Sequence, residues 1–290
     1  MAGNPMLAKM EKEVQQNQPG SGSLQAPPLP PAPYAQAGGA AQAAAVRGGA
    51  MPGGAGYGQP PTTTAVRRMS MDDVIVKTGI VFVILVASAV VGWNLTGTLS
   101  LLAFGSALVA FVLALVISFK KSSSPPLVIL YSIFEGIFLG GISRWYQAYG
   151  ESQGNGNLVL QAVSATLVVF AVMLVVYKTG LIKVNARTTK IFMVMLFSYM
   201  IIGLMSLVAA LFGVGGGWGF YGVGGIGIII SLLAVGLAAF SLVIDFDGIV
   251  RMAQYGVEEK ESWRCAFGLM VSLVWLYLEI LRLLAILNRN

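Results

Sequence analysis

The chain has 290 residues, of which 56% are hydrophobic and only 10% charged. Soluble domains average about 25% charged residues, so this composition predicts an integral membrane protein. The net charge of +6 is typical of basic loops on one side of a membrane, and we expect no nucleic-acid binding. The chain has no His and one Cys. Zinc sites and most Ser or Cys nucleophiles depend on these residues, so we expect neither an enzyme nor a cofactor.

Residues 1–70 differ in composition from the rest of the chain. They are rich in Pro, Gly, Ala and Gln, as in PGSGSLQAPPLPPAP and GGAMPGGAGYGQPP. Such a sequence buries too little apolar surface to offset chain entropy, so we predict a disordered tail. Within it, LQAPPLPPAP also fits a polyproline II segment that docks on an aromatic groove.

Residues 71–290 contain seven apolar runs, each long enough to cross a bilayer. Lipid offers no partner for backbone polar groups, so each run is expected to be a helix. The sequence therefore predicts an all-α bundle of seven transmembrane helices. The expected spans are Val74–Leu95, Leu99–Phe119, Leu127–Trp145, Leu158–Tyr177, Ile191–Phe212, Val223–Ile244 and Trp263–Leu287.

The basic residues of the connections predict the orientation of this bundle. Nearly all of them lie before the first span or between spans two and three, four and five, and six and seven. By the positive-inside rule, the N-terminus is cytoplasmic and the protein is a multi-pass protein of the inner (plasma) membrane. These basic residues are Arg67, Arg68, Lys120, Lys121, Lys178, Lys183, Arg187, Lys190, Arg251, Lys260 and Arg264.

Four acids lie in or beside the predicted spans: Glu135 in the third, Glu279 in the seventh, and Asp245 and Asp247 at the inner end of the sixth. An ionised side chain at the bilayer centre costs at least about 2.5–3.5 kcal/mol. One interpretation is structural. Glu135 and Glu279 would then be protonated and hydrogen-bonded to neighbouring helices, and Asp245 and Asp247 would be solvated acids at a helix end. The other interpretation is a path of oxygen ligands for a cation such as Ca²⁺, for which protons compete. Arg282 follows Glu279 by one turn; it is a candidate ion-pair partner, or it extends to the interface.

Small residues recur within the spans. Gly136 and Gly140 form a GxxxG pattern in the third span, and Gly141 follows them directly. In membranes such a pattern is typical of closely packed helices, because small side chains let two backbones approach. We therefore predict a close helix–helix contact at this face.

Two of these segments, LVIDFDGI and WLYLEILRLL, resemble the Bax inhibitor-1 family, also called the transmembrane Bax inhibitor motif family. Over residues 70–290 the chain is similar to a bacterial branch with a long low-complexity N-terminus. The resemblance implies a proton-sensitive latch, made by two acids of spans six and seven, over a calcium leak path. Asp245 and Glu279 match these positions and would be the calcium ligands, and Asp247 is an additional candidate. Residues 99–119 lack the family's buried arginine of span two.

The leading hypothesis is a pH-sensitive cation leak channel, with Ca²⁺ as the expected ion and Glu135 as a further path acid. The alternative is a non-transporting regulator that binds a membrane protein, such as a quality-control protease, through its GxxxG faces or its tail. The expected spans place Asp245 at the inner surface and Glu279 beyond the midplane, whereas a latch requires contact. Either span seven begins deeper than Trp263, or the helices are offset.

Overall fold

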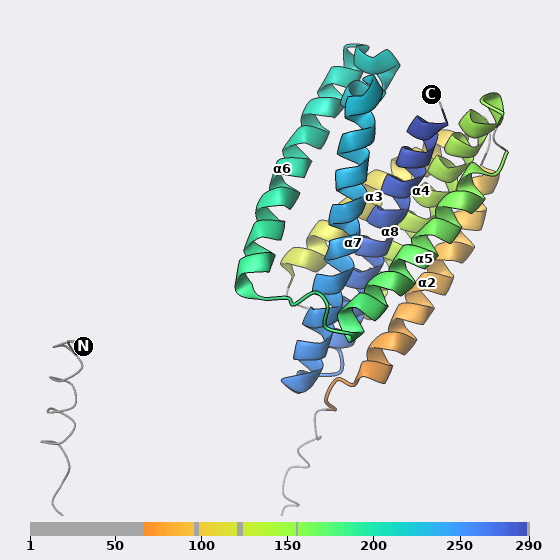
Figure 1. Ribbon diagram of the computed structural model, residues 1–290. Coiled ribbons are helices and arrows are strands. Elements are labelled where there is room, and N and C mark those ends of the chain that lie inside the picture. The colour runs from red at the N-terminus through yellow and green to blue at the C-terminus, as the bar shows by residue number, and fades with distance from the viewer. Residues whose placement is uncertain (1–66, 96–98, 121–123, 155, 289–290) are drawn as a thin grey trace, which may run out of the picture. The chain divides into compact units, whose positions relative to one another are not determined.

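The computed structural model describes residues 67–95, 99–120, 124–154 and 156–288; residues 1–66 of the predicted tail lie outside this part. Seven helices here are long and apolar enough to cross a membrane, and the described residues form no strand (Figure 1). The predicted seven-helix bundle is confirmed, and the protein is a multi-pass integral membrane protein. The helices are α2 (Met71–Asn94), α3 (Ser100–Phe119), α4 (Pro125–Ser152), α5 (Leu158–Lys178), α6 (Ala186–Leu211), α7 (Gly224–Gln254) and α8 (Glu261–Leu287).

The predicted end of the sixth span at Ile244 is wrong, because α7 continues to Gln254. The acidic pair interrupts the apolar run but not the helix. Asp247 forms an i,i+4 ion pair with Arg251 at 2.6 Å, and such pairs support a helix surface. Asp245 therefore lies nine residues before the helix ends, not at its terminus.

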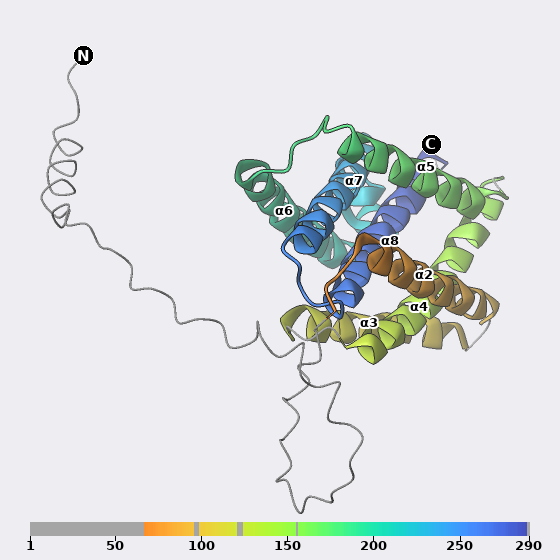
Figure 2. The same ribbon diagram turned by 90° about the horizontal axis from the view of Figure 1, so that it is seen from below.

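Helix α8 is the central element of the bundle. It contacts α2, α4, α5 and α7 (Figure 2). Its membrane span is 56% buried within the protein, whereas the spans of α5 and α6 are each 11% buried. One hydrophobic cluster joins α8 to α5 and α7, and a second joins it to α2, α3 and α4. Side chains on several sides of α8 are consequently shielded from lipid.

The predicted close contact at the GxxxG pattern is confirmed, and its partner is α2. A Cβ atom on Gly140 would lie 2.0 Å from the carbonyl oxygen of Ala89. A Cβ atom on Gly136 would lie 2.4 Å from the carbonyl oxygen of Leu85. Real side chains do not reach such distances, so only glycine lets the two backbones pack here.

One end of the bundle, which we call the basic end, holds the start of α2 and the connections α3–α4, α5–α6 and α7–α8; the other is the far end. At the basic end the segment before α2 pairs with the α7–α8 connection. The amide of Met69 donates to the carbonyl of Val257 at 2.8 Å, and that of Glu259 to the carbonyl of Arg67 at 2.9 Å. Lys77 of α2 forms an ion pair with Glu259 at 3.0 Å. These bonds tie the start of α2 to the start of α8.

Helix α6 is packed least against the bundle. Phe192 and Ser206 are its only buried residues. Its neighbours are the 3₁₀ turns η2 (Val214–Gly217) and η3 (Gly219–Gly222) and, to a smaller extent, α7. Figure 2 shows α6 at the side of the bundle away from α2 and α4. Most of its surface is therefore available to lipid.

Candidate functional site

Glu279 lies in the interior of the far half of the bundle and is 3% exposed. Its carboxylate accepts bonds from three side chains. Arg282 Nη1 lies 3.0 Å from Oε2, Trp275 Nε1 lies 3.2 Å from Oε1, and the Tyr199 hydroxyl donates to Oε1. Two of these donors come from α8 itself, one turn before and one turn after Glu279, and Tyr199 comes from α6. The acid is thus fully partnered within the protein.

Arg282 is held by aromatic residues as well as by Glu279. Its guanidinium lies 4.5 Å from the centre of the Tyr221 ring, within the range of a cation–π interaction. The Tyr221 hydroxyl donates to that of Tyr199 at 3.0 Å. The side chain of Arg282 is 28% exposed, so it neutralises the acid while reaching the surface. We call Glu279, Arg282, Tyr199, Tyr221 and Trp275 the Glu279 cluster.

Asp245 of α7 faces α8 at a different level. Ser272 of α8 is the polar side chain next to its carboxylate. One oxygen of this carboxylate, Oδ2, is buried and has no hydrogen-bond partner in the described part of the chain. Ser272 precedes Glu279 by seven residues, or about 10 Å along a helix. Asp245 therefore lies nearer the basic end than Glu279, and no hydrogen bond or ion pair between described residues joins the two acids.

Asp247 lies in a crevice of about 560 Å³ at the basic end, between the start of α6 and the end of α7. Lys190 and Arg251 also line this crevice, and Asp247 is paired with Arg251. With two basic side chains and one carboxylate, the crevice carries no net negative charge that would favour binding of a metal cation. Asp247 is therefore set apart from Asp245, although only one residue separates them in sequence.

Glu135 is partly buried in α4, and no ion pair or hydrogen bond to it is found among the described residues. It lies one turn from Tyr131 and from Leu139, which share its side of the helix. The Tyr131 ring packs edge-on against Phe267 of α8, with ring centres 4.9 Å apart. Glu135 consequently lies near the α4–α8 contact, away from the Glu279 cluster.

The four acids do not form one metal site. Within the described ranges, no three His, Cys, Asp or Glu side chains are close enough to hold a metal ion. Ca²⁺ takes six to eight oxygen ligands in a resident site. The four carboxylates therefore lie apart from one another rather than around one ion.

Sequence reasoning missed three members of the Glu279 cluster: Tyr199, Tyr221 and Trp275. Tyr and Trp are common at both interfaces of membrane proteins, so their presence in the sequence does not indicate a functional site. Only Trp275 had a usable spacing, because it lies four residues before Glu279 on the same helix face.

The model of the family described as Bax inhibitor 1 like matches residues 4–289. The matched range includes all seven spans and the four acids Glu135, Asp245, Asp247 and Glu279. A comparison with curated proteins finds no match.

Proposed function

The chain belongs to the Bax inhibitor 1 like family, and on that premise we propose that it is a proton-sensitive cation leak channel for which Ca²⁺ is the expected ion. The observation that carries the proposal is the unpartnered oxygen of Asp245. A buried acceptor without a partner costs about 1–3 kcal/mol, and more when it is charged. A cation or a proton at this oxygen would remove that cost. Binding of either one excludes the other, which supports sensitivity to pH.

The Glu279 cluster would act as the closure of this path. The Arg282 guanidinium lies between Asp245 and the far end, and its positive charge opposes a passing cation. Tyr199 links this ion pair to α6, the helix least packed against the bundle. A displacement of α6 would therefore remove one donor from Glu279 and loosen the closure. In this proposal the ion pair Glu279–Arg282 takes the place of a direct latch between Asp245 and Glu279.

Asp247 and Glu135 would have secondary roles. Asp247 would lie at the mouth on the basic end, where the crevice between α6 and α7 opens. Because that crevice also holds two basic side chains, selection for cations would rest on Asp245. Glu135 would offer a further carboxylate on the α4 side of α8.

The decisive experiment measures Ca²⁺ flux into proteoliposomes at several pH values. We expect Asp245→Asn to lower the flux by at least about tenfold, a factor that corresponds to ~1.4 kcal/mol in the barrier. We also expect wild-type flux to fall as pH falls, because protons displace the cation from Asp245, and this dependence to flatten in the variant. Asp72→Asn is the matched control, since Asp72 is an exposed acid in the first turn of α2. Flux no greater than in empty liposomes, from folded protein, would refute the channel.

The alternative function is a non-transporting regulator that binds a membrane protein through its glycine faces or its tail. The glycines of the GxxxG pattern are covered by α2, so they offer no face to a partner. Gly225 and Gly236 of α7 have no neighbour within 4 Å of a Cβ atom, so the α7 face stays a candidate. The tail is the other, and its residues 1–66 lie outside the described structure. Deletion of residues 1–66 separates the two functions: a channel keeps its flux, whereas a regulator that acts through its tail loses its activity.

A further inference from the structure

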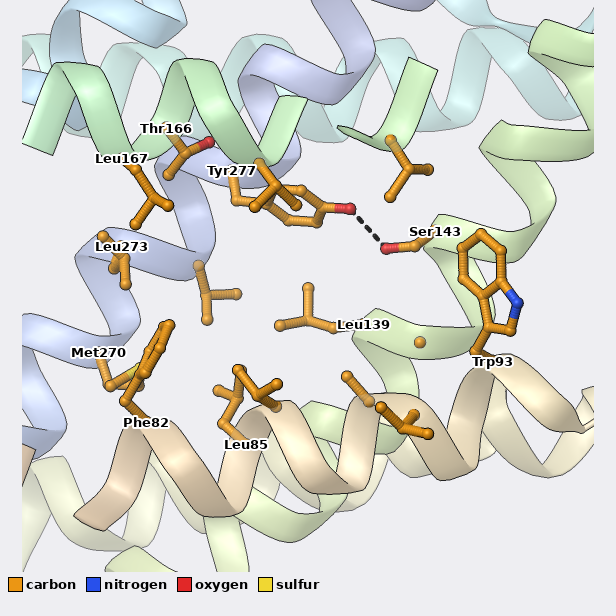
Figure 3. Close-up of a pocket in the computed structure, with 17 residues that line it drawn as sticks. Phe82, Leu85, Trp93, Leu139, Ser143, Thr166, Leu167, Met270, Leu273 and Tyr277 are labelled. Atoms are coloured by element: carbon orange, nitrogen blue, oxygen red, sulfur yellow. Dashed lines mark hydrogen bonds between the residues drawn. The ribbon is translucent and has the colours of Figure 1, made fainter. Parts of the chain in front are cut away.

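A groove with a volume of about 370 Å³ lies between α2 and α5, and we call it the α2/α5 groove. Its sides are formed by these two helices and its floor by α4 and α8 (Figure 3). The lining is almost entirely apolar. The one pair of polar groups in its floor, the hydroxyls of Ser143 and Tyr277, is satisfied by a mutual hydrogen bond of 2.6 Å. The chemistry of the groove therefore suits a hydrocarbon ligand.

The groove opens sideways, toward lipid. Val86 of α2 and Val163 of α5, on its two sides, are exposed, whereas Met270 and Ser143 in its floor are buried. Helices α2 and α5 both pack on α8, but they have no substantial contact with each other. All four lining helices are transmembrane helices. The medium that reaches the groove is consequently the hydrocarbon of the bilayer rather than water.

The length of the groove matches one leaflet. Its lining runs along α2 from Phe82 to Trp93, and the eleven helical steps between them correspond to about 16 Å. Half of a ~30 Å hydrocarbon core is about 15 Å. A transmembrane helix of a partner is too large, because 16 Å of helix about 10 Å across occupies more than 1,000 Å³. A single acyl chain is the occupant that fits both the length and the volume.

A cationic side chain lies at the far-end limit of the groove. The Arg144 guanidinium is 5.5 Å from the centre of the Trp93 ring, and Trp93 lines the groove. Arg144 is exposed, and it forms no ion pair with any described residue. Trp side chains favour the level of the lipid headgroups, where a phosphate would meet this guanidinium.

We propose that the α2/α5 groove is a binding site for one phospholipid of the far-end leaflet. One acyl chain lies in the groove against Met270, and the phosphate binds Arg144. This site is independent of the carboxylates discussed above. It uses another face of α8 and requires no ion movement.

Native mass spectrometry of the full chain, released from detergent and titrated with phosphatidylglycerol, tests the proposal. Wild type should retain one lipid more tightly than any others. Val163→Trp fills the groove and should weaken this binding by at least about tenfold. Val86→Trp fills it from the opposite side and should do the same. Arg144→Gln should weaken the binding of phosphatidylglycerol several-fold while leaving that of diacylglycerol, which has no phosphate, unchanged.

The matched control is Val168→Trp, which places the same side chain on an exposed position of α5 that does not line the groove. It should bind lipid as wild type does. Equal lipid retention in the control and in both groove-filling variants would overturn the proposal, since only lipids around the bundle would then be bound. A dimer that is lost with Val163→Trp would also overturn it, in favour of a second copy of the chain.

Discussion

Replacing Glu279 with Ala is expected to lower the free energy of unfolding by roughly 3 kcal/mol, the lower end of the range for breaking a buried ion pair. The lower end applies because Arg282 is partly exposed. The loss arises from the groups left behind. Arg282 keeps its charge without a counter-ion, and Tyr199 and Trp275 lose their acceptor. Unfolding by SDS from mild detergent, followed by circular dichroism, measures the change.

A double variant separates this explanation from a general loss of packing. Glu279→Ala combined with Arg282→Met removes both charges, so it should be more stable than Glu279→Ala alone. Asp72→Ala, at an exposed acid of α2, should change stability by less than about 0.5 kcal/mol. Additive losses in the double variant would contradict the proposed pairing.

Replacing Gly140 with Leu is expected to prevent the α2–α4 contact from forming. Overpacking of a core commonly costs about 1–3 kcal/mol, where side chains can adjust. Here the first added atom would meet the backbone oxygen of Ala89 at 2.0 Å, so the helices themselves must separate. We expect a loss above about 3 kcal/mol, or no folded protein. The same SDS unfolding experiment and the yield of monodisperse protein provide the measurement.

Gly203→Leu is the matched control for this substitution. Gly203 lies within α6, and a Cβ atom there would have no neighbour within 4 Å. The same change from Gly to Leu should therefore be tolerated. If both variants were equally unstable, the glycines would matter for helix insertion rather than for close packing.

The spans were predictable because lipid imposes one rule on each of them independently. An apolar run of sufficient length must form a helix, and its neighbours are not needed for that inference. The same local reasoning failed at Ile244. The prediction ended the helix where the first charged residues, Asp245 and Asp247, follow the apolar run. The helix α7 instead continues through both acids to Gln254.

The surroundings of Glu279 could be predicted only in part. Arg282 and Trp275 lie one turn away on the same helix, so their spacing to Glu279 is visible in the sequence. Tyr199 lies eighty residues earlier, and its approach depends on how α6 and the glycine-rich 3₁₀ turns fold back. The packing of separate helices decides such contacts, and one sequence does not reveal it.

The position of Asp245 along α8 could not be predicted either, because it also depends on how separate helices pack. Its position on α7 is evident from the sequence, but its partner depends on the register of α7 against α8. The structure places it beside Ser272 rather than Glu279. A shift of two helical turns along α8 would be needed to exchange these partners.

The central place of α8 has a consequence for biosynthesis. α8 is made after the other six helices, yet it supplies a share of both hydrophobic clusters. Membrane helices first insert separately and then associate. Until α8 has been made, the faces of α2, α4, α5 and α7 that pack against it are open to lipid or to a chaperone. Any chain that stops before α8 would therefore expose these faces and become a target for proteolysis in the membrane.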